Sequence, residues 1–263
     1  MSVRPAAVAG LFYPDEPQEL RGMVATCLRG VVAQTTQPLV PKALIVPHAG
    51  YVFSGPVAAS AYIRLAALRE RVRRVVLFGP AHRVAFRGIA VSSADAFETP
   101  LGRVEIDREA VSEALALPHV HILDRAHTEE HSLEVQLPFL QTVLGEFRLV
   151  PLLVGDATPQ EVESVIETLW GGDETFLLVS SDLSHYLSYE AARRVDRETT
   201  RAIEQLDPEE IGYDQACGRV PVQGLLLAAR RRGLRVTTLD LRNSGDTAGP
   251  RDTVVGYGAY VFG

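Results

Sequence analysis

Histidines follow strand-like apolar runs at several points along this chain. ALIV at 43–46 is followed two residues later by His48, VVLF at 75–78 four residues later by His82, and FLLV at 176–179 six residues later by His185. In open α/β sheets, ligands bind beside the carboxyl ends of the strands. If these strands are parallel neighbours, the histidines meet over one crevice. A histidine in one loop is ordinary, but the repeated placement favours a functional site.

Imidazole nitrogens suit iron, copper, zinc and nickel. Non-haem Fe(II) oxygenases combine two histidines with one anionic ligand and leave coordination positions open. Cys217 is a candidate for the anionic ligand because it comes just before an expected helix start, where the helix dipole lowers a thiol's pKa. The alternative role, a small buried hydrophobe, is equally compatible with the sequence. Cys27 lies on the apolar face of an expected helix and fits that buried role.

The stretch HTEEH at 127–131 matches the HxxEH pattern of a class of zinc metalloproteases. Thr128 resembles a helix N-cap, with Glu129 and Glu130 in the first turn. That start would leave His127 outside the helix, so the two histidines would not share a helical face. We therefore exclude a zinc protease and expect His131, inside the helix, to face the crevice.

Strand-like runs and helical patterns alternate through most of the chain. Several strands are apolar throughout, as strands covered on both faces are. The pattern predicts an α/β fold, with a mostly parallel sheet flanked by helices. The expected strands are 43–46, 75–78, 89–91, 149–154, 176–179, 236–241 and 254–262. The expected helices are 16–29, 56–68, 108–117, 129–144 (interrupted by Pro138), 159–170, 189–206 and 221–232.

Composition excludes several classes of function. The chain has 263 residues and a formal net charge of −7, which argues against a nucleic-acid-binding face. No uninterrupted apolar stretch approaches the roughly 18 residues of a membrane helix, and the N-terminal residues lack the apolar core of a signal peptide. We therefore expect a single cytoplasmic domain over residues 1–263, with no membrane partner.

Specific motifs carry a resemblance that covers almost the whole chain. VPHAGYVFSGPVAASAY, LFGPAHR, HTEEHSLEVQLPFL, PLLVGD, VSSDLSH and ACGRVPV occur in this order, flanked by AVAGLFYP near the N-terminus and SGDTAGPRDTVVGYGAY near the C-terminus. In this content and order the chain resembles the Memo family, named for mediator of ErbB2-driven cell motility. Prokaryotic members are called AmmeMemoRadiSam system protein B.

The resemblance implies a three-layer α/β/α sandwich similar to class III extradiol dioxygenases. It implies that His48 and His82 are metal ligands and that Cys217 occupies the place of the dioxygenase carboxylate ligand. His185 matches the acid/base histidine of those enzymes, with Asp182 close by. Iron as Fe²⁺ is the first expectation, with copper or zinc as alternatives. A thiolate changes metal preference and redox behaviour, so ring cleavage does not transfer automatically.

These residues support two hypotheses about function. The first is a metal-dependent redox enzyme of dioxygenase type, whose small anionic substrate contacts Arg83 and Arg219. The second is a non-catalytic module that binds an anionic or phosphorylated ligand in the same crevice, with Tyr51 and His131 also in contact. Both arginines have an alternative role in salt bridges. The family name also implies a pathway link to radical-SAM and AMMECR-type proteins.

Overall fold

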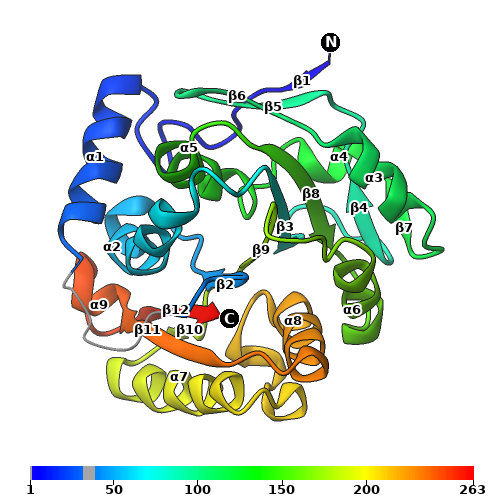
Figure 1. Cartoon of the computed structure of the whole chain (residues 1–263). Coiled ribbons are helices and arrows are strands. Elements are labelled where there is room, and N and C mark those ends of the chain that lie inside the picture. The colour runs from blue at the N-terminus through cyan, green and yellow to red at the C-terminus, as the bar shows by residue number, and fades with distance from the viewer. Residues whose placement is uncertain (1, 32–38) are drawn as a thin grey trace.

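A large mixed sheet lies at the centre of the molecule (Figure 1). The computed structural model describes residues 2–31 and 39–263. Its strands are β1 (Val3–Arg4), β2 (Ala43–Val46), β3 (Arg74–Pro80), β4 (Ile89–Val91), β5 (Ala96–Thr99), β6 (Gly102–Glu105), β7 (Val120–Ile122), β8 (Arg148–Val154), β9 (Thr175–Ser180), β10 (His185–Leu187), β11 (Val236–Asn243) and β12 (Val254–Phe262). The order in the large sheet is β10-β12-β2-β9-β3-β8-β4-β7, and β11 pairs with β12. Strands β1, β5 and β6 form a smaller sheet.

The centre of the large sheet is parallel and its margins are mixed. Strands β2, β9, β3 and β8 run parallel to one another. Strand β12 joins β2, and β4 joins β8, in antiparallel pairs. All residues of β2 and β9 are buried, as the apolar runs predict. The α/β class is confirmed, while the parallel pairing expected for most of the sheet is concentrated in its centre.

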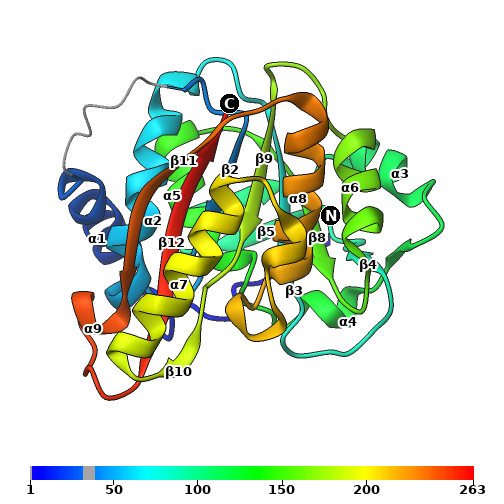
Figure 2. The same cartoon turned by 90° about the horizontal axis from the view of Figure 1, so that it is seen from below.

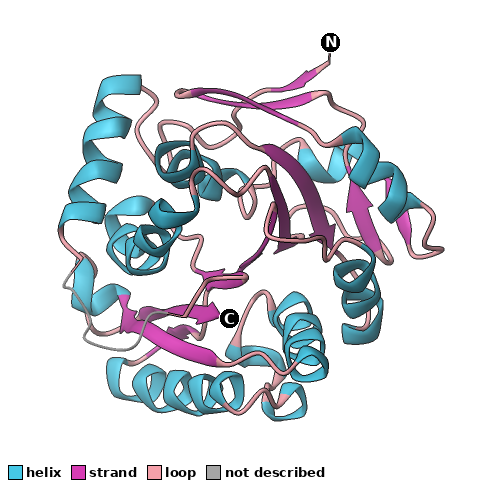
Figure 3. Ribbon diagram, viewed as in Figure 1, coloured by secondary structure: helices cyan, strands magenta, loops and turns pink. Residues whose placement is uncertain are grey.

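Helices cover both faces of the large sheet (Figure 3). They are α1 (Pro17–Arg29), α2 (Tyr51–Tyr62), α3 (Arg108–Leu115), α4 (Asp124–His127), α5 (Leu137–Leu144), α6 (Pro159–Thr168), α7 (Tyr189–Glu204), α8 (Arg219–Arg232) and α9 (Ser244–Thr247). Helices α1, α2 and α5 pack together on one side, whereas α6 packs on α8, and α7 on β11 and β12. Figure 2 places α7 and α8 in front of the strands, on the side opposite α2. The helices thus complete the three layers.

One apolar segment has the length of a membrane span. In the described part of the chain, Tyr51–Leu68 qualifies by length and composition, with a mean hydropathy of 1.2. The sequence analysis missed it because Arg64 and small residues interrupt the apolar pattern. Half of the segment is buried inside the protein, where α2 contacts β12, β11 and α1. A core helix passes the same test, so the segment is weak evidence for a membrane span.

The helix expected from Thr128 onward is wrong at its start. Helix α4 ends at His127, Thr128 follows it as the C-terminal cap, and His131 lies in a loop before the 3₁₀ turn Glu134–Gln136. The carbonyls of residues 127 and 130 flank the expected helix start, and a helix from residue 129 would use the second of them in its own hydrogen bonds. Here the guanidinium of Arg4 occupies both of these carbonyls. The local sequence favours a helix, but this tertiary contact overrides it.

Arg4 and Glu134 form a buried ion pair that anchors the N-terminal segment to this loop. Arg4 Nη1 donates to Glu134 Oε2, and the side chains are 6% and 0% exposed. The Glu134 carboxylate also accepts hydrogen bonds from Ala7 N, Val8 N and the Tyr13 hydroxyl. The loop that carries His131 is therefore held at both ends by groups from the first 13 residues.

Replacing Arg4 with methionine should destabilise the protein strongly. The substitution keeps a long side chain but leaves the Glu134 carboxylate buried without its cation, which costs about 3–5 kcal/mol of the free energy of unfolding. Urea denaturation at pH 7 measures the change. Arg103→Met is the matched control, because its ion pair with Glu98 is exposed and is worth less than about 1 kcal/mol. Equal losses in the two variants would contradict the anchoring role of Arg4.

Candidate metal centre

His48, His82 and His131 converge at the carboxyl edge of the central strands. In the described part of the chain, one ligand atom from each of them lies within 4.8 Å of the other two. The ring centroids are 5.2 Å apart for His48 and His82, 5.3 Å for His48 and His131, and 4.6 Å for His82 and His131. His48 follows β2 and His82 follows β3, as expected. We refer to these three residues as the histidine cluster.

A glycine allows the His131 loop to approach the end of β3. A Cβ at Gly79 would lie 2.8 Å from Ser132 Oγ and 2.8 Å from a Leu133 methyl carbon. The Ser132 hydroxyl donates to Pro80 O at 2.8 Å, which fixes the loop against the strand. Any larger residue at position 79 would push this loop, and with it His131, away from His82.

The Glu130 carboxylate orients His82. Glu130 Oε1 lies 2.9 Å from His82 Nδ1, and Oε2 accepts the His82 backbone N–H at 2.5 Å. Burial opposes ionisation of Glu130, but the adjacent His131 and His82 rings and the Ser132 N–H hold its pKa well below its usual range. An ionised carboxylate requires Nδ1 to carry the hydrogen, which leaves the lone pair of His82 Nε2 for a metal. Metal-binding histidines commonly use this arrangement.

His48 is buried and neutral. Its Nδ1 lies 2.9 Å from Ser180 Oγ, and its Nε2 lies 3.2 Å from Cys217 Sγ. Burial, followed by the proximity of His82 and His131, lowers the pKa of His48 well below its ordinary value. Neutral imidazole is the form that binds metals.

His131 is packed between two rings and keeps a buried nitrogen without a partner. Its ring lies 4.6 Å from that of Phe12 and is stacked on His82. Among the described residues, His131 Nδ1 has no hydrogen-bond partner, although Glu130 Oε1 is 3.2 Å away. A buried polar atom without a partner is rare and calls for an explanation such as a bound ion.

Cys217 lies beside the histidine cluster but outside the group of mutually close donors in the described chain. The residue directly precedes Gly218, the N-cap of α8, and its sulfur accepts the Asp182 N–H at 3.3 Å. A Cβ at Gly218 would lie 2.7 Å from Ser181 Cβ, so glycine permits this close approach to the end of β9.

The expectation that the helix terminus lowers the pKa of Cys217 is wrong for the metal-free site. Burial, followed by the nearby Asp182 carboxylate, raises the pKa of this thiol to about 12. Burial outweighs the helix dipole because the sulfur is enclosed even though part of the residue borders a cavity. Cys217 therefore binds a metal as thiolate only if the metal displaces its proton.

Asp182 and His185 lie next to the cluster without joining it. Asp182 Oδ1 accepts the backbone N–H groups of His48 and Ala49, at 2.8 and 3.3 Å. His185 Nδ1 lies 2.8 Å from the carbonyl oxygen of Leu183, so Nδ1 is the donor and Nε2 is unprotonated in the neutral ring. The expected meeting of His185 with His48 and His82 is therefore wrong, and His131 is the third member of the cluster.

The residues expected to contact a substrate occupy different surroundings. Tyr51 is buried and donates its hydroxyl to Val135 O at 2.6 Å, so this group is engaged in the core. Arg83 is exposed. Arg219 lines a cavity of about 410 Å³ together with Cys217, and its guanidinium lies 5.5 Å from the ring centre of Tyr213. Arg219 is therefore better placed than Arg83 to contact a ligand beside Cys217.

The donor set fits a transition-metal ion. The cluster supplies the buried imidazole of His48, the half-buried imidazole of His131 and the exposed imidazole of His82. Ser180 engages Nδ1 of His48, and Glu130 engages Nδ1 of His82. His131 contributes a buried nitrogen without a partner among the described residues. Imidazole and thiolate donors suit iron, copper and zinc, whereas calcium and magnesium prefer oxygen. A possible metal-binding site is therefore present, and its chemistry favours the softer ions.

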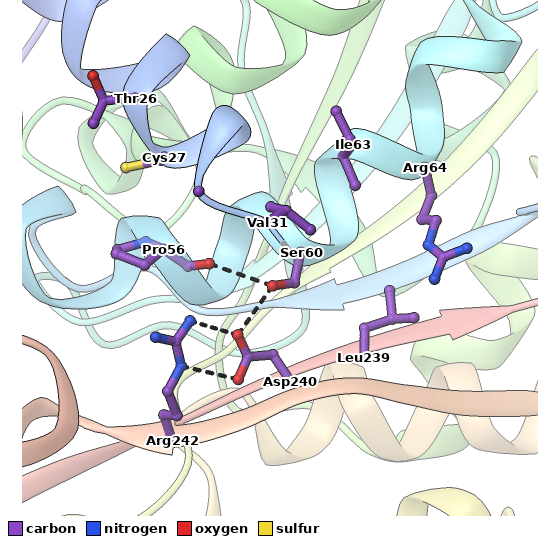
Figure 4. A pocket seen from close by; sticks show the side chains of 11 residues that line it. Thr26, Cys27, Val31, Pro56, Ser60, Ile63, Arg64, Leu239, Asp240 and Arg242 are labelled. Carbon is purple, nitrogen blue, oxygen red and sulfur yellow. Dashed lines mark hydrogen bonds and ion pairs between the residues drawn. The ribbon is translucent and has the colours of Figure 1, made fainter. Parts of the chain in front are cut away.

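Another cavity, of about 830 Å³, lies between α1, α2 and β11 and is lined by Cys27 (Figure 4). Three of its polar side chains, those of Ser60, Asp240 and Arg242, are paired with each other. Ser60 Oγ donates to Asp240 Oδ2 at 3.0 Å, and Arg242 forms two hydrogen bonds with the same carboxylate. Cys27 is half-buried against the core, in agreement with the hydrophobic role expected for it. This cavity lacks the converging donors of the histidine cluster.

Glu130, Ser180 and Gln136 are functional residues that the sequence analysis did not identify. Glu130 and Ser180 contact cluster histidines, and Gln136 contacts Ser180, in each case between segments distant in sequence, so no local spacing reveals these roles. Glu130 offered a partial signal, because it lies next to His131 in the HTEEH stretch. Its role as a carboxylate that orients His82 becomes visible only when residues 82 and 130 are brought together.

The fold and the cluster define an α/β protein with a candidate metal centre at the carboxyl edge of its sheet. The family model described as Memo-like protein matches residues 4–261. The chain belongs to this Memo family, as the motifs predict. It is 38% identical to a MEMO1 family protein of Aquifex aeolicus, covering 100% of both chains. It is 39% identical to one of Ignicoccus hospitalis, covering 100% of this chain and 99% of that protein.

A solved structure supports the fold. An uncharacterised protein of Escherichia coli K12 superposes with a TM-score of 0.55 at 14% identity, covering 83% of this chain and 98% of the other. At this level of identity the similarity concerns the fold alone.

Replacing Glu130 with glutamine should weaken metal binding. An amide cannot accept hydrogen bonds at both ends, so His82 Nδ1 or the backbone N–H groups lose their partner. Loss of such a partner typically costs about 10–100-fold in metal affinity. Competition of Zn²⁺ with a chromogenic chelator measures the affinity. Glu129→Gln, at an exposed neighbouring position, is the control and should bind as the wild type does. An unchanged affinity in Glu130→Gln would refute the orienting role.

Proposed function

We propose that this protein is a metal-dependent redox enzyme of dioxygenase type that uses Fe²⁺. The observation that carries the proposal is the set of three histidines around one point, of which His48 is buried and has its pKa lowered by that burial, with the Cys217 sulfur 3.2 Å from His48 Nε2. His48 and His82 would hold the ion, with His131 and Cys217 as the remaining candidates. Bound Fe²⁺ with open positions supplies the ability to bind O₂ and substrate together. Copper and zinc are the alternatives.

His185 is suited to move a proton beside the cluster. Its Nδ1 donates to the Leu183 carbonyl, so Nε2 of the neutral ring is free to accept a proton. Histidine is the side chain that most often transfers protons in enzymes at neutral pH. The Asp182 carboxylate would act mainly by positioning, because its Oδ1 accepts the backbone N–H groups of His48 and Ala49.

The cavity beside Cys217 would bind a small anionic substrate. Arg219 supplies a cation at its wall, and Val84, Phe86 and Pro221 supply apolar contacts. A carboxylate or phosphate on the substrate would pair with the guanidinium. The chemistry would take place in the cytoplasm, and the family name links it to radical-SAM and AMMECR-type proteins of the same pathway.

Loading with Fe²⁺ under anaerobic conditions tests the proposed ligands. The His48→Ala and Cys217→Ser variants should retain much less iron than the wild type after desalting, because each loses a donor at the site. Metal analysis by mass spectrometry gives the stoichiometry. His121→Ala removes an imidazole from the edge strand β7, outside the cluster, and should load fully. Full loading of both His48→Ala and Cys217→Ser would show that the ligand assignment is wrong.

The two arginines should differ in ligand binding. Arg219→Ala should weaken the binding of phenyl phosphate, which has an anionic and an apolar end, by about 10–100-fold. That range corresponds to the loss of a charged hydrogen bond. Arg83→Ala, at an exposed position, should bind as the wild type does. Isothermal titration calorimetry measures both, and equal affinities in the two variants would contradict a role for Arg219 in this cavity.

A binding module without catalysis is the alternative function. The raised pKa of Cys217 favours it, because a protonated thiol is a poor metal ligand. Such a module should bind phenyl phosphate equally well before and after treatment with a chelator. A metal-dependent enzyme should lose its O₂-consuming activity on the same treatment.

A further inference from the structure

Gln136 has only one orientation that satisfies its hydrogen bonds. Its Nε2 lies 3.0 Å from the carbonyl oxygen of Pro47 and 2.7 Å from Ser180 Oγ, and its Oε1 accepts the Tyr62 hydroxyl at 2.7 Å. A carbonyl oxygen can only accept, so the NH₂ group must face Pro47 and Ser180. Gln136 therefore donates to Ser180 Oγ.

The other hydrogen bonds of Ser180 determine which atom is the donor between Ser180 and His48. Its hydroxyl lies 2.6 Å from the carbonyl oxygen of Ser132, which can only accept, so the hydroxyl hydrogen points to Ser132. A serine hydroxyl has one hydrogen and two lone pairs. One lone pair already accepts from Gln136. The other faces His48 Nδ1 at 2.9 Å, and this nitrogen must therefore carry a hydrogen.

We propose that Gln136 and Ser180 are positioning residues that fix neutral His48 in the Nδ1–H tautomer, so that Nε2 directs its lone pair at the cluster and at Cys217. The use of this tautomer in metal binding rests on the proposed function, whereas the hydrogen bonds that fix it do not involve a metal. The tautomer places the thiol hydrogen of Cys217 on the line to His48 Nε2. A metal ion would take the place of that hydrogen.

Burial makes this arrangement rigid. Ser132 and Ser180 are 0% exposed and Gln136 is 1% exposed, so solvent has little access to exchange partners. The network joins β9, the loop after β2 and the His131 loop. The Ser180 hydroxyl accepts from Nδ1 of His48, as the Glu130 carboxylate accepts from Nδ1 of His82, but the hydroxyl is neutral. A neutral partner suits His48, whose surroundings are fully buried.

The wild-type tautomer is the first test. Long-range ¹H–¹⁵N correlation spectra of the metal-free protein at pH 8 distinguish protonated from unprotonated imidazole nitrogens, and the signals lost in His48→Gln assign this ring. We expect a protonated Nδ1 and an unprotonated Nε2. A protonated Nε2, or an average over both tautomers, would overturn the inference.

Ser180→Ala tests the positioning role. Without the serine acceptor, the Nε2–H tautomer should become populated, and Zn²⁺ affinity should fall by about 10–100-fold. Ser184→Ala is the matched control: this serine is equally buried, and its hydroxyl has no partner among the described residues. The control should keep both the wild-type tautomer and the affinity. An unchanged tautomer in Ser180→Ala would overturn the inference.

The outcomes separate this inference from the proposed function. Wild-type protein with the Nδ1–H tautomer that fails to bind Zn²⁺ or Fe²⁺ would refute the proposed function and leave the inference intact. Metal binding by wild-type protein with the Nε2–H tautomer would refute the inference alone. If Ser180→Ala does not fold, the tautomer of His48 in the wild-type spectrum still confirms or overturns the inference.

Discussion

The buried carboxylate of Glu130 ties the loop after β3 to the loop that carries His131. It accepts hydrogen bonds from the backbone and ring of His82 and from the backbone of His131 and Ser132. Arg4 fixes the same loop from the other side through the carbonyls of residues 127 and 130. The position of two cluster histidines thus depends on one ionised group, which its surrounding donors keep charged despite burial.

Two features of the histidine cluster would be stabilised by a bound cation. Burial, followed by the neighbouring imidazoles, disfavours protonation of His48, and His131 keeps a nitrogen without a hydrogen-bond partner among the described residues. A cation bound between the rings would satisfy the free lone pairs and compensate for the adjacent Glu130 charge. Cys217 adds a thiol whose raised pKa makes its participation dependent on the metal. The site is therefore organised by its hydrogen-bond partners before any metal enters.

The sequence predicted the parts of this structure that depend on local pattern. Buried apolar runs identified the central strands, and the residues after β2 and β3 identified His48 and His82. It failed where distant segments meet. Contacts of Arg4 with the carbonyls of residues 127 and 130 are found where a helix was expected, and His131 lies in a loop. Burial raises the pKa of Cys217, which the sequence analysis expected to be lowered. Gln136 and Ser180 lie in two of the family motifs, but their role could not be predicted from them, because it depends on three segments meeting in the core.

A crystal structure of the protein loaded with Fe²⁺ under anaerobic conditions, with anomalous data collected on both sides of the iron absorption edge, tests the central claim most directly. The account predicts an iron peak between His48, His82 and His131, in contact with their unprotonated nitrogens. A fully loaded protein whose iron lies away from these histidines would contradict it.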